Sequence, residues 1–313
     1  MMCDLTRPEF TDADKAREAL ERIRWPDGAA CPHCGGTERV YPIKPNPEKK
    51  VRAGLYKCND CLKQFTVTVG TVFEGSKVPL NKWWAAVHLM CASKKGISSK
   101  QLERMLGVTY KTAWFMSHRI REAMRQPGGV MGSGGGAVEA DETFIGRDKT
   151  VKPDRTKKGR GYAHKHKILA LVDRESGQAK MMVVDDLKAA TLAPLVRENV
   201  SHEARLMTDE ASQYTLVGRE YADHGVVHHG KGEYGRGEIH TNTIEGFFSV
   251  FKRGMKGVYQ HCAKHHLHRY TGEYDFRYNH RERLGYSDAE RTAAALKGIE
   301  GKRLTYRRPS VAS

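Results

Sequence analysis

The segment from Val138 to Ile145 reads VEADETFI, in which β-forming residues surround a cluster of acids. Valine, threonine, phenylalanine and isoleucine favour strands, whereas aspartate is depleted there. Asp141 is therefore an unusual residue for the strand expected here, which makes it a candidate for a functional role. The elements expected after it are strands at 167–173 and 179–184, a helix at 189–200 and a strand at 205–208. This order predicts a mixed α/β sheet.

Two further acids accompany Asp141. Asp209 directly follows the strand expected at 205–208, so the two aspartates are expected at adjacent strand positions. Glu245 lies in the segment 240–253, which reads HTNTIEGFFSVFKR and predicts a helix with its isoleucine and phenylalanines on one side. A lone acid at such a place is usually a cap or a solvated charge, but the ordered set of three is more specific. Clustered carboxylates suit phosphodiester chemistry, in which two divalent cations about 3.5 to 4 Å apart activate the attacking hydroxyl and stabilise the leaving oxygen.

Two Cys-x-x-Cys pairs lie toward the amino-terminal side of the chain. They read CPHC at 31–34 and CNDC at 58–61. Four thiolates in two such knuckles suit a closed, tetrahedral zinc site with a structural role, because a catalytic zinc would keep an open position. The alternation at 64–69 predicts a strand that would complete a ribbon hairpin. The expected zinc ligands are Cys31, Cys34, Cys58 and Cys61.

Three helices are expected between residues 80 and 125, and the last two form a candidate helix-turn-helix. They run over 98–106 and 109–121, with a turn at Gly107 and Val108. In such a unit the second helix enters the major groove and its amino-terminal residues face base edges. Any small three-helix unit gives the same pattern, so a purely structural role is the alternative. The expected DNA contacts in this helix are Thr109, Tyr110, Lys111, Thr112 and Arg119.

The charge balance favours a polyanionic partner. The chain contains 53 Lys and Arg against 37 Asp and Glu, a formal net charge of +16. Nucleic acid is the leading candidate, and a solvated basic surface is the alternative. The segment 147–167 holds nine Lys or Arg, so we expect a mobile loop that clamps DNA through Lys157, Lys158 and Arg160. No signal peptide or long apolar run is evident, which predicts a cytoplasmic, nucleoid-associated protein without a membrane partner.

Several segments carry a family resemblance that spans most of the chain. They read CPHC at 31–34, KCNDCLKQFTVTVGT at 57–71, VEADET at 138–143, HTNTIE at 240–245 and KRG at 252–254. In these segments the chain resembles the DDE-type transposases of bacterial insertion sequences, in particular the ISXO-like group with an N-terminal zinc ribbon. The resemblance implies a ribonuclease H-like catalytic domain.

By the same resemblance, Asp141, Asp209 and Glu245 hold two magnesium or manganese ions, and Lys252 contacts DNA with Arg253 beside it. Residues seven apart return to one helical face, which fits the spacing from Glu245 to Lys252. Some members of the group have asparagine in place of the third acid, and Asn242 lies one helical turn before Glu245. Both are candidates, and Glu245 is preferred because a charged oxygen binds magnesium better than an amide does.

These observations predict a multidomain α+β protein. Its expected parts are a helix capped at Thr11 with the zinc ribbon at 1–79, the helix-turn-helix domain at 80–127, a Gly-rich linker at 128–137, the ribonuclease H-like mixed α/β domain at 138–300 and a disordered tail at 301–313.

The expected activity is that of a transposase that binds the terminal inverted repeats of an insertion sequence and catalyses metal-dependent strand cleavage and strand transfer. Its partners would be double-stranded DNA, at element ends and at the target, and further copies of the chain in a homodimer or larger synaptic complex. A non-enzymatic DNA-binding regulator with an inactive transposase-like domain is one alternative. A nuclease that cuts but never joins is another.

Overall fold

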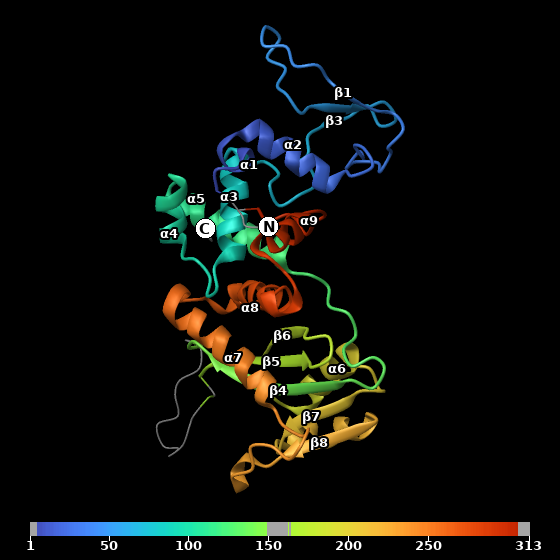
Figure 1. The fold of residues 1–313 in the computed structure, drawn as a ribbon, viewed down its shortest axis with the longest axis vertical. Coiled ribbons are helices and arrows are strands. Elements are labelled where there is room, and N and C mark those ends of the chain that lie inside the picture. The colour runs from blue at the N-terminus through green and yellow to red at the C-terminus, as the bar shows by residue number, and fades with distance from the viewer. Residues whose placement is uncertain (1–4, 149–161, 163, 306–313) are drawn as a thin grey trace, which may run out of the picture. The chain divides into compact units, whose positions relative to one another are not determined.

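A computed structural model describes residues 5–148, 162 and 164–305. They form two compact units, of which the first combines Met1–Met124 with Tyr286–Ser313 and the second is Arg125–Gly285 (Figure 1). The chain thus leaves the first unit, builds the second and returns to the first. Residues 286–300, which the sequence analysis grouped with the catalytic domain, lie in the first unit. Among the described residues, no helix has the length and apolar character needed to cross a bilayer.

The first unit contains helices and a small sheet. Its elements are α1 (Pro8–Thr11), α2 (Ala13–Arg24), β1 (Val40–Pro42), β2 (Tyr56–Cys58), β3 (Gln64–Phe65), α3 (Leu80–Ala92), α4 (Ser99–Leu106), α5 (Tyr110–Met124) and α9 (Asp288–Lys297). The cap of α2 is Asp12 rather than the expected Thr11, because its carboxylate accepts hydrogen bonds from the N–H groups of Asp14 and Lys15. Thr11 instead ends α1.

The small sheet is an antiparallel ribbon in the order β1-β2-β3. Its third strand ends at Phe65, earlier than the strand expected over 64–69, because the backbone then enters a turn in which the N–H of Val69 donates to the carbonyl of Thr66. The ring of Phe65 stacks on Tyr56 and meets Trp25 edge-on. These aromatic contacts give the ribbon its apolar side.

Helix α9 completes the helical part of the first unit. It packs on α3, where Nδ1 of His88 lies 3.0 Å from Oγ1 of Thr292. The segment after α9 contacts the segment that follows β3, since the N–H of Val72 donates to the carbonyl of Ile299. Residues distant in sequence therefore share one core.

The second unit is a mixed sheet with helices. Its elements are β4 (Ala137–Ile145), β5 (His166–Asp173), β6 (Ala179–Val184), α6 (Ala189–Asn199), β7 (Arg205–Asp209), η1 (Ser212–Tyr214), η2 (Val217–Glu220), β8 (Asp223–Val227), η3 (His229–Lys231), α7 (Asn242–Gly254), the π-helix η4 (Met255–Tyr259), α8 (Lys264–Asn279) and η5 (Glu282–Leu284). The strand order is β6-β5-β4-β7-β8, in which the pairs β4–β5 and β5–β6 are antiparallel and the pairs β4–β7 and β7–β8 are parallel.

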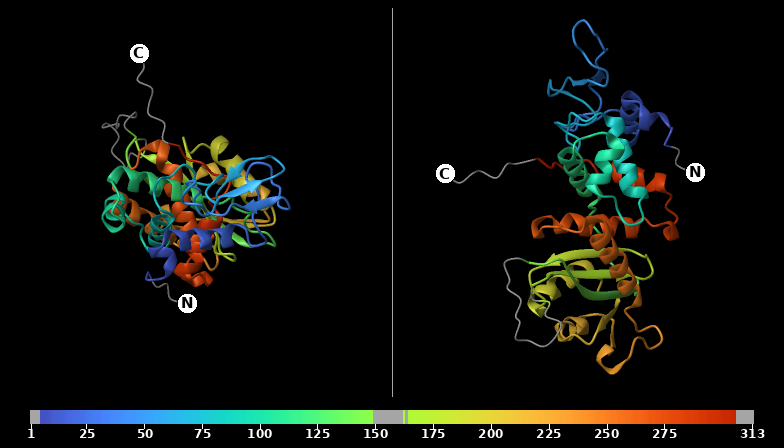
Figure 2. Two further views of the ribbon diagram at one scale, coloured as in Figure 1. Left: turned by 90° about the horizontal axis from the view of Figure 1, so that it is seen from above. Right: turned by 90° about the vertical axis from the view of Figure 1, so that its left-hand side faces the viewer.

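Each face of this sheet has its own core. One face packs against α6, with Val138 and Ala140 of β4 in the cluster. The other face packs against α7 and α8, with Ile145 at the end of β4 (Figure 2). Side chains alternate between the faces of a strand, so the odd-numbered residues of β4 face α7. Helix α7 can thus meet Asp141 but not its neighbours in sequence.

The Gly-rich segment before β4 is bound to the second unit. Met131 is buried, and its N–H donates to the carbonyl of Asn199 while its carbonyl accepts from the N–H of Ser201. The N–H of Gly132 donates to the carboxylate of Asp173 at 3.0 Å. A Cβ on Gly132 would meet Ala204 at 2.4 Å, so the close approach requires glycine. This part of the expected linker is therefore held against the second unit by hydrogen bonds and close packing.

Candidate functional site

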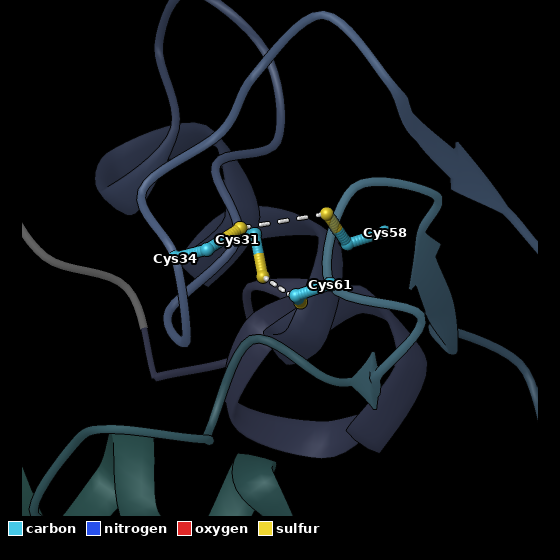
Figure 3. A group of neighbouring side chains, drawn as sticks. All are labelled: Cys31, Cys34, Cys58 and Cys61. Carbon is cyan, nitrogen blue, oxygen red and sulfur yellow. Dashed lines mark hydrogen bonds between the residues drawn. The ribbon is translucent and has the colours of Figure 1, made fainter.

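The four predicted cysteines form one cluster (Figure 3). Their Sγ atoms all lie within 4.8 Å of one another, and both the Cys31–Cys61 and Cys34–Cys58 pairs are 3.6 Å apart. A tetrahedron with zinc–sulfur bonds of about 2.3 Å has edges of about 3.8 Å. The cluster therefore has the dimensions of a Cys₄ zinc site, as the sequence predicted.

Two tight turns bring the cysteines together. The N–H of Gly35 donates to the carbonyl of Cys31, and Gly35 has a φ of +78° that favours glycine. The N–H of Cys58 donates to the carbonyl of Lys63 across the second turn. Although burial opposes ionisation, backbone N–H groups and neighbouring thiols lower the pKa of Cys31 to about 7. This thiol therefore releases its proton readily when a metal ion binds the sulfur.

Helices α4 and α5 lie where the periodicity predicted them. Ser98 caps α4, because its Oγ accepts a hydrogen bond from the N–H of Gln101 at 3.2 Å. Gly107 ends α4 with a φ of 59°. Leu102 and Ala113 are buried between the helices. The result is a compact helix, turn and helix.

The expected DNA contacts on α5 differ in their exposure. Thr109, Tyr110 and Lys111 are exposed and Thr112 is half-buried. Arg119 is buried, and its guanidinium donates to the carbonyls of Glu74 and Leu304, both at 3.1 Å. The expectation that Arg119 contacts DNA is therefore corrected, because its donors already serve the interior of the first unit.

Strands β4 and β7 place two aspartates side by side. The parallel register pairs Val138 with Leu206 and Glu139 with Met207. Continuing this register by two residues sets Asp141 level with Asp209, on the same face of the sheet. Asp209 ends β7, and its carboxylate accepts a hydrogen bond from the N–H of Ala211 at 3.0 Å.

Glu245 reaches the same area from the first turn of α7. Its side chain is 51% exposed. Oγ1 of Thr241 lies 3.4 Å from Oε1 of Glu245, and Nε2 of His229 lies 3.7 Å from the same oxygen. Burial, together with the charges of Asp209, Glu142 and Glu245, raises the pKa of Asp141 to about 8, against the opposing effect of the Glu142 N–H. The charges of both other candidate ligands, Asp209 and Glu245, thus contribute to the pKa of Asp141.

The carboxylates are grouped less tightly than the cysteines. Within 5–148, 162 and 164–305, the cysteines alone form a set of three or more His, Cys, Asp or Glu ligands within 4.8 Å. Carboxylates repel one another unless cations neutralise them. The oxygen donors of Asp141, Asp209 and Glu245 fit magnesium or manganese in chemistry. Burial is the main cause of the raised pKa of Asp141, and the charges of Asp209, Glu142 and Glu245 add to it.

The remaining candidates lie along α7. Burial lowers the pKa of Lys252, while the charge of Asp141 opposes this effect. Lys252 is therefore on the side of α7 that faces the aspartates, whereas Arg253 is exposed. Asn242 is exposed at the first residue of the helix. The expected clamp residues Lys157, Lys158 and Arg160 lie outside the described residues.

The sequence analysis did not single out several polar residues that shape this site. Glu139 is fully buried on the same face of β4 as Asp141. The carboxylate of Glu210 accepts hydrogen bonds from the N–H groups of His229 and Gly230, at 2.7 and 2.9 Å, and so holds the turn that presents His229 to Glu245. The alternation of β4 could have indicated Glu139, but no local pattern connects Glu210 with His229.

Comparisons with known proteins match two stretches of the chain. Residues 134–279 match the ISXO2-like transposase domain, and residues 11–64 match the transposase zinc-ribbon domain. A Halobacterium salinarum protein described as an uncharacterized protein in transposable element ISH50 is 29% identical over 264 residues. The match covers 79% of this chain and 84% of the relative.

Proposed function

We propose that this chain, which matches the ISXO2-like transposase domain and the transposase zinc-ribbon domain, binds the terminal inverted repeats of an insertion sequence and catalyses metal-dependent DNA cleavage and strand transfer. The observation that carries this proposal is the convergence of Asp141, Asp209 and Glu245 from β4, β7 and α7. A single acid at any of these places would be unremarkable, but two aspartates on one face of the sheet with a glutamate from the helix on that face support the proposal.

DNA recognition is assigned to the first unit. We infer that α4 and α5 act as a helix-turn-helix, with Thr109, Tyr110, Lys111 and Thr112 toward the major groove. The exposure of the first three of these residues supports the assignment. Zinc held by the four cysteines would stabilise the ribbon, because a ribbon with so small an apolar side depends on its metal. The net charge of +16 suits a phosphate backbone.

Catalysis is assigned to the second unit, for which we infer a ribonuclease H-like fold. When bound, two magnesium or manganese ions supply charge neutralisation at the attacking and leaving oxygens. Asp141, Asp209 and Glu245 would hold the ions through their carboxylate oxygens. Lys252, about two turns of α7 beyond Glu245, would neutralise a phosphate, and Arg253 would contact DNA from its exposed side.

The proposed reaction has two steps of phosphoryl transfer. Water attacks a phosphorus atom at the element end, and the bond to the 3′ oxygen breaks to leave a 3′ hydroxyl. That hydroxyl then attacks a phosphorus atom of the target, where one phosphorus–oxygen bond forms and another breaks. Two element ends must meet at one target, so we infer a homodimer or larger synaptic complex.

The test incubates the purified chain with magnesium, a labelled fragment carrying the element end and a supercoiled target. Asp141→Asn, Asp209→Asn and Glu245→Gln should each lower the joined product by at least about a hundredfold, the scale of losing one electrostatic contact to a transition state. Asn242→Ala should join DNA if Glu245 is the third ligand. Asp223→Asn, which neutralises an exposed acid at the start of β8, is the matched control.

The products separate the proposal from its competitors. Joined DNA that depends on the three acids supports a transposase. Tight binding without cutting, across several ends and metals, would indicate a regulator instead. Cutting without joining would indicate a nuclease.

A further inference from the structure

A buried carboxylate connects β4 to the first turn of α7. Glu139 is fully buried, and its Oε2 accepts a hydrogen bond from the N–H of Ile244 at 2.8 Å. Ile244 is the third residue of α7, where N–H groups have no partner within the helix. A negative charge at this end of a helix is also favoured by the helix dipole. Glu139 therefore holds the start of α7 from the strand beneath it.

Arg174 supplies the opposite charge and fixes the chain that leads into α7. Its Nε donates to Oε1 of Glu139 at 2.6 Å. Its two terminal nitrogens donate to the carbonyls of Glu238 and His240, each at 2.6 Å. One guanidinium thus binds the strand and the segment just before the helix. An unpaired charge at Glu139 would be costly, so the two side chains act as a pair.

This pair connects the two segments that carry the candidate metal ligands Asp141 and Glu245. Glu139 is two residues before Asp141 on the same face of β4, and Ile244 is the residue before Glu245. The carboxylate that holds α7 is therefore directly linked to both segments that present oxygen ligands. A small shift of the first turn of α7 would move Glu245 while leaving Asp141 and Asp209 on the sheet.

We propose that Glu139 and Arg174 are positioning residues that hold the first turn of α7 so that Glu245 shares a metal ion with Asp141 and Asp209. This inference rests on the proposed function of those three carboxylates. Misplacing a ligand by about 1 Å is enough to cost about a hundredfold in rate. The pair would thus set the geometry of the site without touching metal or DNA.

The experiment uses iron(II) as the metal probe. Iron(II) with ascorbate and peroxide produces hydroxyl radicals where the ion binds, and these cut nearby backbone. The parent chain should be cut near residues 141, 209 and 245. The double variant Glu139→Leu with Arg174→Met should fold, because replacing a whole buried ion pair by apolar side chains is often neutral for stability. Cutting near residue 245 should fall at least fivefold relative to cutting near residue 141.

A second buried pair provides the matched control. Glu273 and Arg277 form a buried ion pair within α8, 2.7 Å apart. The variant Glu273→Leu with Arg277→Met should leave the ratio of cuts unchanged. It should also leave the magnesium concentration for half-maximal DNA joining unchanged, whereas the Glu139 and Arg174 double variant should raise it about tenfold. A loss of stability alone would affect both pairs alike.

Each outcome decides between the inferences. If the parent is not cut near the three acids, the proposed metal site fails, and this inference fails with it. If the parent is cut at all three places and the Glu139 and Arg174 variant shows the same ratio, the positioning role is overturned while the proposed function stands. Should the double variant not fold, Glu139→Gln decides by the same ratio. It keeps an oxygen for Ile244 and should show a smaller fall, and an unchanged ratio overturns the positioning role.

Discussion

Asp141 and Glu142 are neighbours on β4, yet their side chains lie on opposite faces of the sheet. Glu142 accepts hydrogen bonds from Tyr214 and Gln213, on the side that packs against α6. Asp141 senses Glu245 and Lys252 on the side of α7. Burial raises the pKa of both acids. The hydrogen bonds from Tyr214 and Gln213 oppose this effect at Glu142, whereas the charges of Asp209, Glu142 and Glu245 add to it at Asp141 and its pKa is raised to about 8.

The metal-free protein should lose stability as the pH rises from about 4 to about 8. Folding raises the pKa of Asp141 from its ordinary value of 3.8 to about 8, so the folded state binds more protons than the unfolded state in this interval. The free energy of unfolding then falls by up to about 1.4 kcal/mol per pH unit. Asp141→Asn should reduce this slope in denaturant melts with EDTA, and Asp223→Asn should not. Equal slopes in the parent and Asp141→Asn would contradict the prediction.

Zinc content should depend on the four cysteines and on no cysteine of the second unit. Cys58→Ser removes one of four thiolates and should lower bound zinc from about one ion per chain to near zero after dialysis. Cys262→Ser is the control, because Cys262 belongs to the second unit. Metal analysis and the rate of proteolysis within 25–64 measure the result. Retention of zinc by Cys58→Ser would show that the cluster is not the site.

Gly107→Ala should destabilise the first unit by about 1 kcal/mol. The φ of 59° at Gly107 is costly for a residue with a Cβ, although that Cβ would meet only Nζ of Lys82, at 3.9 Å. Gly107→Asn should cost less, because asparagine tolerates this conformation better. The midpoint of denaturant unfolding measures both variants. A loss that is equal in the two would mean that strain at this φ is not the cause.

Lys111→Ala should weaken DNA binding and lower the salt dependence by about one released ion, if Lys111 contacts a phosphate. Its exposure at the start of α5 makes this contact possible. Lys15→Ala is the control of equal charge, since Lys15 lies on α2 in an ion pair with Glu18. Binding is measured over a range of salt concentrations. Equal losses in both variants would point to net charge rather than to α5.

Local patterns in the sequence predicted most of the elements. Strands β4 to β7, the two helices around Gly107 and the cysteine cluster depend on residues close together in the chain, whereas β8 was not predicted. The short β3 was not predicted, because the turn at Thr66 replaces the strand without disturbing the alternation. The burial of Arg119 was also missed, since its partners Glu74 and Leu304 are 45 and 185 residues away.

Contacts between residues distant in the sequence also limit what could be predicted of the candidate site. Asp141, Asp209 and Glu245 are marked by an acid at a strand or helix and by the family resemblance. The Glu139–Arg174 pair is not, because it connects residues that are 35 apart and closes on Ile244, 105 residues from Glu139. The sequence around an acid in a strand does not show whether its carboxylate binds a cation or accepts a hydrogen bond from the first turn of a helix. Only the three-dimensional partners tell the two apart.

The return of the chain to its first unit has a consequence during synthesis. The face of α3 that carries His88 and Cys91 is covered by α9, where the thiol of Cys91 lies 3.7 Å from the carbonyl of Arg291. That covering helix leaves the ribosome only after the whole of the second unit has been made. The first unit thus begins to be synthesised before the second unit but is completed after it. A chain interrupted before Tyr286 would lack α9, and the face of α3 that α9 covers would be exposed.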